Sequence, residues 1–312
     1  MDLVFLVLAL LALWQGTDFA LEGALRISER FGVSQGFIGL TVLAIGTGLP
    51  ELVVGVVGGM EQLSGTEASG VVVGNVTGSV VAQGALVLGL SGLYTHLRLA
   101  PRMIRRDGII LLLAIGLFTL VSIDGRIVRA EGALLILAYA IYLVALVQAE
   151  RRGKNTPKKP SKRRAIVDFA TVALGLVTVV VAANVVVIQA ISIAEAWNVS
   201  QTVIGIFIVG AGTSLPELAV SVRAAWKGQT SISVGNVIGS NTFDLMVPLG
   251  ASSMLFPLAV SRDTLVIDVP VMMVVTVATL IFFLWRKGIQ KGEAASLLLM
   301  YVGYLVVRVF VI

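Results

Sequence analysis

The feature that most constrains this chain is a series of apolar stretches, each long enough to cross a membrane. A transmembrane helix needs about 20 mostly apolar residues, and ten such stretches follow one another with short gaps between them. They cover approximately residues 3–25, 37–60, 70–94, 107–123, 130–149, 166–194, 201–223, 230–257, 265–284 and 292–311. The sequence therefore predicts an all-α integral membrane protein with ten transmembrane helices.

The composition agrees with a membrane protein and excludes several kinds of site. Of the 312 residues, 57% are hydrophobic and 13% are charged, whereas a soluble domain has about 25% charged residues. The chain has no cysteine and a single histidine, His96. Disulfides, thiolate metal sites and sites with several histidine ligands are therefore excluded.

A basic segment divides the chain into two halves. Residues 151–164 read RRGKNTPKKPSKRR and hold eight basic residues and no acidic ones. We interpret 151–165 as a cytoplasmic linker between a first five-span repeat, 1–150, and a second, 166–312. With the linker inside, nineteen of the 23 basic residues lie on the cytoplasmic side, as the positive-inside rule requires. This predicts a multi-pass plasma-membrane protein with both termini outside. The net charge of +5 then reflects topology and lipid contact, and no nucleic-acid partner is expected.

The two halves contain the same sequence motifs. Residues 33–56 align with 199–222 without a gap at an offset of 166, and 13 of 24 positions are identical. A second pair, GNVTGS at 74–79 and GNVIGS at 235–240, follows in the same order. Because each repeat has five predicted spans, an odd number, the second copy would enter the membrane from the opposite side. We therefore expect two inverted five-helix repeats, an architecture typical of secondary transporters.

Three acidic residues lie midway along predicted spans: Glu51, Glu217 and Asp244. An ionised group at this depth costs about 2.5–3.5 kcal/mol, so each needs a compensating charge. No lysine or arginine lies at mid-depth in any predicted span. We therefore expect a mobile partner, either a metal cation or protons.

The surrounding motifs supply oxygen ligands for such a cation. The segments GTGLPE (46–51) and GTSLPE (212–217) each place a proline directly before the glutamate. Proline removes a backbone donor and disrupts the helix, which frees carbonyls in that turn, including those of Gly46 and Gly212. Irregular backbone at this depth is tolerated only where it is buried in protein or lines a wet cavity. Carbonyl, hydroxyl and carboxylate oxygens suit calcium, sodium or magnesium rather than zinc or copper.

The second motif of each half, 74–83 and 235–244, adds polar side chains at a spacing of four residues, which places them on one face of a helix. These side chains are Asn75, Ser79 and Gln83 in the first half, and Asn236, Ser240 and Asp244 in the second.

Together these motifs resemble the calcium/cation antiporter superfamily, most closely its prokaryotic sodium/calcium exchanger branch, over essentially the full length. The resemblance implies a transporter, not an enzyme, that exchanges calcium for sodium by alternating access. It implies calcium and sodium ions and membrane lipid as partners, with no cofactor and no obligate protein partner. The implied calcium ligands are Glu51, Glu217, Thr47 and Thr213. The implied sodium ligands are Ser214, Ser240, Asp244, Ser79 and Gln83.

The first half departs from the family pattern at three positions. It has Gly48 where the family usually has serine, Val80 where a polar residue is common, and Gln83 where asparagine or aspartate is common. Gly48 removes one hydroxyl ligand opposite Ser214. Fewer sodium ligands would alter the stoichiometry or favour protons, so exchange of calcium or magnesium for protons is an alternative. A passive cation channel is the alternative from another class, which the inverted repeat disfavours.

Overall fold

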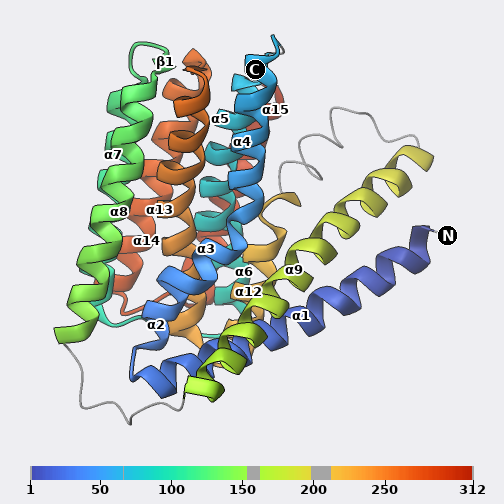
Figure 1. The fold of residues 1–312 in the computed structure, drawn as a ribbon, viewed down its shortest axis with the longest axis vertical. Coiled ribbons are helices and arrows are strands. Elements are labelled where there is room, and N and C mark those ends of the chain that lie inside the picture. Colours follow the sequence, from blue (N-terminus) through green and yellow to red (C-terminus); the bar gives the residue numbers. More distant parts are fainter. Residues whose placement is uncertain (1, 66, 153–161, 198–211, 311–312) are drawn as a thin grey trace.

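The computed structural model describes residues 2–65, 67–152, 162–197 and 212–310, and these are almost entirely helical (Figure 1). The elements, in chain order, are α1 (Asp2–Phe31), α2 (Gln35–Ile38), the π-helical turn η1 (Gly39–Leu43), α3 (Ala44–Thr47), α4 (Leu49–Leu63), α5 (Ser69–Val81), the π-helical turn η2 (Ala82–Val87), α6 (Leu88–Tyr94), α7 (Pro101–Ser122), β1 (Arg126–Ile127), α8 (Arg129–Arg152), α9 (Lys162–Ala196), α12 (Leu215–Trp226), α13 (Thr230–Leu255), β2 (Leu258–Ala259), the π-helical turn η4 (Thr264–Asp268), α14 (Val269–Trp285) and α15 (Lys291–Phe310).

Long apolar helices confirm that the chain is a helical membrane protein. Within the described ranges, five helical segments are long and apolar enough to cross a membrane: Leu3–Phe31, Ser69–Tyr94, Arg129–Arg151, Ala165–Ala194 and Thr264–Trp285. A sixth would be the pair Gln35–Thr47 and Leu49–Leu63, which is bent by 41°. The described parts of the other predicted spans are also helical, in α7, α12, α13 and α15. These helices do not reach the same combination of length and apolarity, so the total of ten spans stays a prediction.

Helix α13 lies at the centre of the bundle. Of its 26 residues, 20 are buried. Its glycines let other backbones approach closely, as small residues do in membrane helix packing. A Cβ atom on Gly235 would lie 2.6 Å from the carbonyl oxygen of Gly36, and one on Gly239 would lie 2.7 Å from that of Leu40. The segment α2–η1–α3 therefore packs against α13 almost backbone to backbone.

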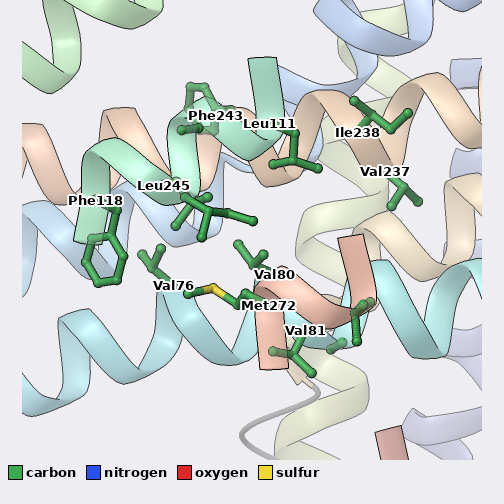
Figure 2. Close-up of a cluster of buried hydrophobic side chains, with 14 of the residues drawn as sticks. Val76, Val80, Val81, Leu111, Phe118, Val237, Ile238, Phe243, Leu245 and Met272 are labelled. Atoms are coloured by element: carbon green, nitrogen blue, oxygen red, sulfur yellow. The ribbon is translucent and has the colours of Figure 1, made fainter. Parts of the chain in front are cut away.

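A cluster of buried apolar side chains packs between α13 and the neighbouring helices (Figure 2). The labelled members come from α5, α7, α13 and α14: Val76, Val80, Val81, Leu111, Phe118, Val237, Ile238, Phe243, Leu245 and Met272. Other large apolar side chains point outward, such as Leu113 and Leu120 on α7 and Leu137 on α8. Because lipid tails are as apolar as leucine, close packing rather than exclusion of water holds this core together.

The connecting segments gather at two ends of the bundle. At one end β1 pairs with β2 in antiparallel register, with Arg126 opposite Ala259. At the other end Leu97 and Ile289 exchange backbone hydrogen bonds of 3.0 and 3.1 Å, and the Thr230 hydroxyl donates to the Arg98 carbonyl at 3.1 Å. Each of these contacts joins segments that the charge pattern assigns to the same side of the membrane.

Helices α1 and α9 form a pair that crosses the rest of the bundle obliquely (Figure 1). Their glycines permit close contact, because a Cβ atom on Gly23 would lie 2.6 Å from the side chain of Val172. The side chains of Arg26 and Arg30 on α1 both bind Asp168 on α9. Helix α8 continues to Arg152 and α9 begins at Lys162, so most of the predicted linker, 151–165, lies outside the described residues.

Candidate cation site

The three carboxylates singled out in the sequence are fully buried. Glu51 lies in the first turn of α4, Glu217 in the first turn of α12, and Asp244 in the middle of α13. In the part of the chain that the structure describes, none of the three forms an ion pair with lysine or arginine. A cation or protons would therefore have to balance them.

The two glutamates sit on the same local structure, a break in a helix. Gly48 precedes α4 with φ −78° and ψ 4°, and Ser214 precedes α12 with φ −85° and ψ 7°. In both halves a proline follows as the second helical residue and the glutamate as the third. Since Pro50 has no N–H, the carbonyl of Gly46 loses its usual donor. The helix N-terminus also favours negative charge in its first turn, so each break combines a carbonyl that lacks its usual donor with a stabilised carboxylate.

Hydroxyl contacts cross between the halves in matching pairs. The Oγ1 of Thr47 lies 3.4 Å from the Oγ of Ser240, and the Oγ1 of Thr213 lies 3.4 Å from the Oγ of Ser79. The first-half break thus meets the second-half GNVIGS helix, and the second-half break meets the first-half GNVTGS helix. The Ser79 hydroxyl also donates to Oε1 of Glu51 at 3.4 Å. These contacts involve five of the predicted ligands and connect the two halves of the chain.

A direct hydrogen bond joins two further predicted ligands. The Gln83 amide donates from Nε2 to Oδ2 of Asp244 at 2.8 Å, and both side chains are fully buried. Next to them, Asn241 donates from Nδ2 to the carbonyl of Val80 at 3.4 Å. Asn241 was not among the residues selected from the sequence, although it directly follows the GNVIGS motif, and its buried position adds it to the site.

Several buried oxygen atoms of the site have no hydrogen-bond donor among the described residues. They are Oε2 of Glu51, both carboxylate oxygens of Glu217, Oδ1 of Asp244, Oε1 of Gln83, Oγ of Ser214 and Oδ1 of Asn241. A buried polar atom without a partner costs about 1–3 kcal/mol. Carboxylate, hydroxyl and amide oxygens are the ligands that calcium and sodium prefer, so binding of such a cation would compensate this cost.

Gly46 and Gly212 pack closely against α9. A Cβ atom on Gly46 would collide with the side chain of Leu176, and one on Gly212 would lie 2.6 Å from Val187. Both glycines therefore have a packing role in addition to the carbonyls expected from the sequence. Their position makes α9 one wall of the site.

The acidic side chains do not form a metal site by themselves. Within the described ranges, no group of three aspartate, glutamate or histidine side chains is close enough together to hold a metal ion. Any cation bound here would therefore depend on the hydroxyl, amide and carbonyl oxygens between the carboxylates.

Other buried carboxylates are paired with arginine, unlike those of the site. Asp268 accepts hydrogen bonds from Arg308 and Tyr304, both at 3.0 Å, and from Thr77 at 3.2 Å. Asp107 accepts from Arg106 at 2.8 Å and from Tyr142 at 3.4 Å. The sequence reasoning missed both networks. A signal was present, because the two aspartates are 161 residues apart, the same offset as the two GNVxGS motifs.

Comparisons with known proteins show the family of the chain. The family model described as sodium/calcium exchanger protein matches residues 1–148 and 167–310. The chain is 34% identical to the sodium/calcium exchanger MaX1 of Methanosarcina acetivorans, with 99% of each chain covered. It is 30% identical to the inner membrane protein YrbG of Escherichia coli over 94% of this chain and 92% of that protein.

A solved structure has the same fold. The sodium–calcium exchanger NCX_Mj, soaked with 10 mM Na⁺ and no Ca²⁺, superposes with a TM-score of 0.85 at 29% identity, over 96% of both chains. The family model and the full-length relative MaX1 name the same family. The chain is therefore a transporter that belongs to the sodium/calcium exchanger family.

Proposed function

We propose that this protein exchanges calcium for sodium across the membrane by alternating access. The observation that carries the proposal is the set of three buried carboxylates without a basic partner among the described residues, surrounded by hydroxyl and amide oxygens from both halves. Family membership and the full-length similarity to MaX1 point to the same activity.

Charge neutralisation explains how the two fluxes would be coupled. Three ionised carboxylates at mid-depth cost roughly 8–10 kcal/mol if uncompensated. One calcium ion or several sodium ions would remove most of this cost. A loaded site can then close to both sides of the membrane and reopen to the side opposite the one from which the ion entered. An empty, charged site resists closure. Calcium and sodium therefore compete for the same carboxylates, and each crosses the membrane only in exchange for the other.

We infer that ten spans are arranged as two inverted repeats of five. Three observations support this inference. The breaks at Gly48 and Ser214 have the same backbone conformation. The two threonine–serine contacts have the same length. One family model matches each half separately. Two states related by the pseudo-twofold axis would open the shared site to opposite sides of the membrane.

The distribution of basic residues between the two ends of the bundle supports the orientation that we propose. The end that includes Leu97, Thr230 and Ile289 carries most of the basic residues in its loops and would face the cytoplasm. The end with β1 and β2 would face outward, and we propose the same side for both termini. The basic linker then lies on the cytoplasmic side, where it would contact anionic lipid. We propose the plasma membrane as the location.

We assign the ions to the residues as follows. Glu51, Glu217, Thr47 and Thr213 would hold calcium, together with the carbonyls of Gly46 and Gly212. Sodium would use Ser79, Ser214, Ser240 and Asp244, with Gln83 beside Asp244. The hydroxyl contacts and the buried oxygens without a donor support this assignment.

Calcium uptake into sodium-loaded proteoliposomes tests the function. We expect Glu51→Gln and Glu217→Gln to reduce uptake at least about 100-fold, because each removes a charge that calcium must have in the site. Glu61→Gln is the matched control, because it makes the same change at an exposed position of the same helix, α4. It should transport like the wild type.

The choice of gradient distinguishes the alternatives. A sodium gradient should drive uptake more strongly than a proton gradient; the reverse result would favour exchange for protons. Conductance without counter-transport would indicate a channel. Full uptake by both glutamine variants would refute the assigned site.

A further inference from the structure

The two helix breaks differ at one position that faces the cation site. Ser214 in the second half corresponds to Gly48 in the first, at an offset of 166. Their backbone conformations are nearly identical. The Ser214 side chain is buried, and its hydroxyl oxygen has no partner among the described residues. A serine at position 48 would therefore present an equivalent hydroxyl from the first half, and the glycine removes it.

An aromatic ring fills the space that a side chain at position 48 would need. A Cβ atom on Gly48 would lie 2.8 Å from Cδ1 and 3.0 Å from Cε1 of Phe243. Phe243 is buried in the apolar cluster of Figure 2, and its ring packs edge to face on Tyr139 with a centroid distance of 5.6 Å. Tyr139 therefore helps to hold the Phe243 ring in place. The ring brings no oxygen to the cation site.

The repeat pairs the opposite residue types at the equivalent positions. At the offset of 161 that aligns the GNVxGS motifs, the counterpart of Phe243 is Ala82. Gly48 with Phe243 thus corresponds to Ser214 with Ala82. The first pair brings no hydroxyl oxygen, and the second brings one.

A hydrogen bond to Asp244 also lowers the negative charge that is available to a cation. Asp244 and Gln83 are counterparts at the offset of 161, and the Gln83 amide donates to Asp244 at 2.8 Å. An amide N–H directed at a carboxylate oxygen partly compensates its charge and occupies a direction from which a cation would otherwise approach.

We propose that the transport site is one-sided: it has a monovalent-cation position beside Ser214 but none beside Gly48, where Phe243 takes its place. The consequence is that the protein exchanges each calcium ion for one sodium ion fewer than a site with a hydroxyl at both positions would. This inference rests on the proposed sodium–calcium exchange and specifies its stoichiometry.

The equilibrium calcium gradient measures this stoichiometry directly. In proteoliposomes with the membrane voltage clamped at zero, the calcium concentration ratio equals the sodium ratio raised to the number of sodium ions per calcium. The slope of the logarithmic plot gives that number. The double variant Gly48→Ser/Phe243→Ala introduces the residue types of Ser214 and Ala82, which are the counterparts of these two positions in the repeat. We expect its slope to exceed the wild-type slope by one, which means about tenfold more calcium accumulation at a tenfold sodium gradient.

Two further variants control the experiment. Phe118→Ala also truncates a buried phenylalanine of the same apolar cluster, and its slope should equal that of the wild type. Ser214→Ala removes the hydroxyl at the one helix break that has it, and its slope should be lower than the wild-type slope by one. This variant tests the proposal even if the double variant does not fold.

The outcomes separate this inference from the proposed function. An unchanged slope in the double variant, or in Ser214→Ala, together with sodium-driven uptake would overturn the one-sided site but leave the exchange function intact. Absence of sodium-driven uptake in the wild type would overturn both.

Discussion

Replacement of Gly239 by alanine should weaken calcium transport because it separates the two elements that form the site. A Cβ atom at this position would lie 2.7 Å from both the Cβ of Ala44 and the carbonyl oxygen of Leu40. Favourable contacts between such atoms begin at about 3.5 Å. Because backbone atoms cannot rotate away as a side chain can, α13 and the segment η1–α3 must move apart by about 0.8 Å.

This shift bears directly on the predicted ligands. Thr47 and Ser240 lie on the two elements that separate, and their hydroxyl oxygens are 3.4 Å apart. Calcium–oxygen distances in proteins fall within 2.3–2.6 Å, so a displacement of about 0.8 Å is larger than the whole tolerance. Overpacking of this kind costs about 1–3 kcal/mol. If half of that cost falls on the loaded state, calcium affinity decreases by about 2- to 13-fold.

Sodium-driven calcium uptake, measured as a function of external calcium, checks this prediction. We expect the half-saturating calcium concentration of Gly239→Ala to rise by about 2- to 13-fold, with a parallel decrease in thermal stability. Gly116→Ala is the control, because Gly116 lies on the exposed face of α7 and a Cβ atom there meets no described atom within 4 Å. A half-saturating concentration equal to that of the wild type in Gly239→Ala would refute the reasoning.

Two further predictions concern the charged networks outside the site. Asp268→Ala should destabilise the protein by about 3 kcal/mol, because it leaves Arg308 without its buried partner. The control Asp263→Ala, at an exposed position, should have no effect. Equal melting temperatures of the two variants in detergent would contradict this prediction. Asp18→Asn should destabilise it by about 1 kcal/mol, because the carboxylate binds Arg223 at 2.8 Å and Lys227 at 2.7 Å in a partly exposed setting. That loss should shrink in 1 M salt, and a salt-independent loss would indicate packing instead of charge.

The helix breaks and the three unpaired carboxylates could be predicted from the sequence because they are local properties. A proline removes its own N–H wherever the helix lies, so the interruption before Glu51 follows from the adjacent Pro50. A carboxylate in the middle of an apolar stretch can equally be recognised from the sequence. The same holds for the absence of lysine or arginine at that depth. For the same reason the sequence predicted the kind of ligand atoms and the class of transported ion.

The contacts between the two halves depended on tertiary structure, because their partners lie more than a hundred positions apart. The sequence did not indicate that Thr47 meets Ser240, or that Gln83 donates to Asp244. The first of these contacts depends on how closely α13 approaches α2–η1–α3, which the glycines at positions 235 and 239 permit.

The sequence by itself determined that this is a helical membrane protein with repeated motifs and uncompensated acidic residues, since hydropathy and charge act at each residue separately. Only the tertiary structure decided that Gly48 faces Phe243 and that Arg308 neutralises Asp268. The physical reason is that van der Waals contact and ion pairing act over a few ångströms. Which residues come within that range is therefore set by the packed bundle and not by their order in the chain.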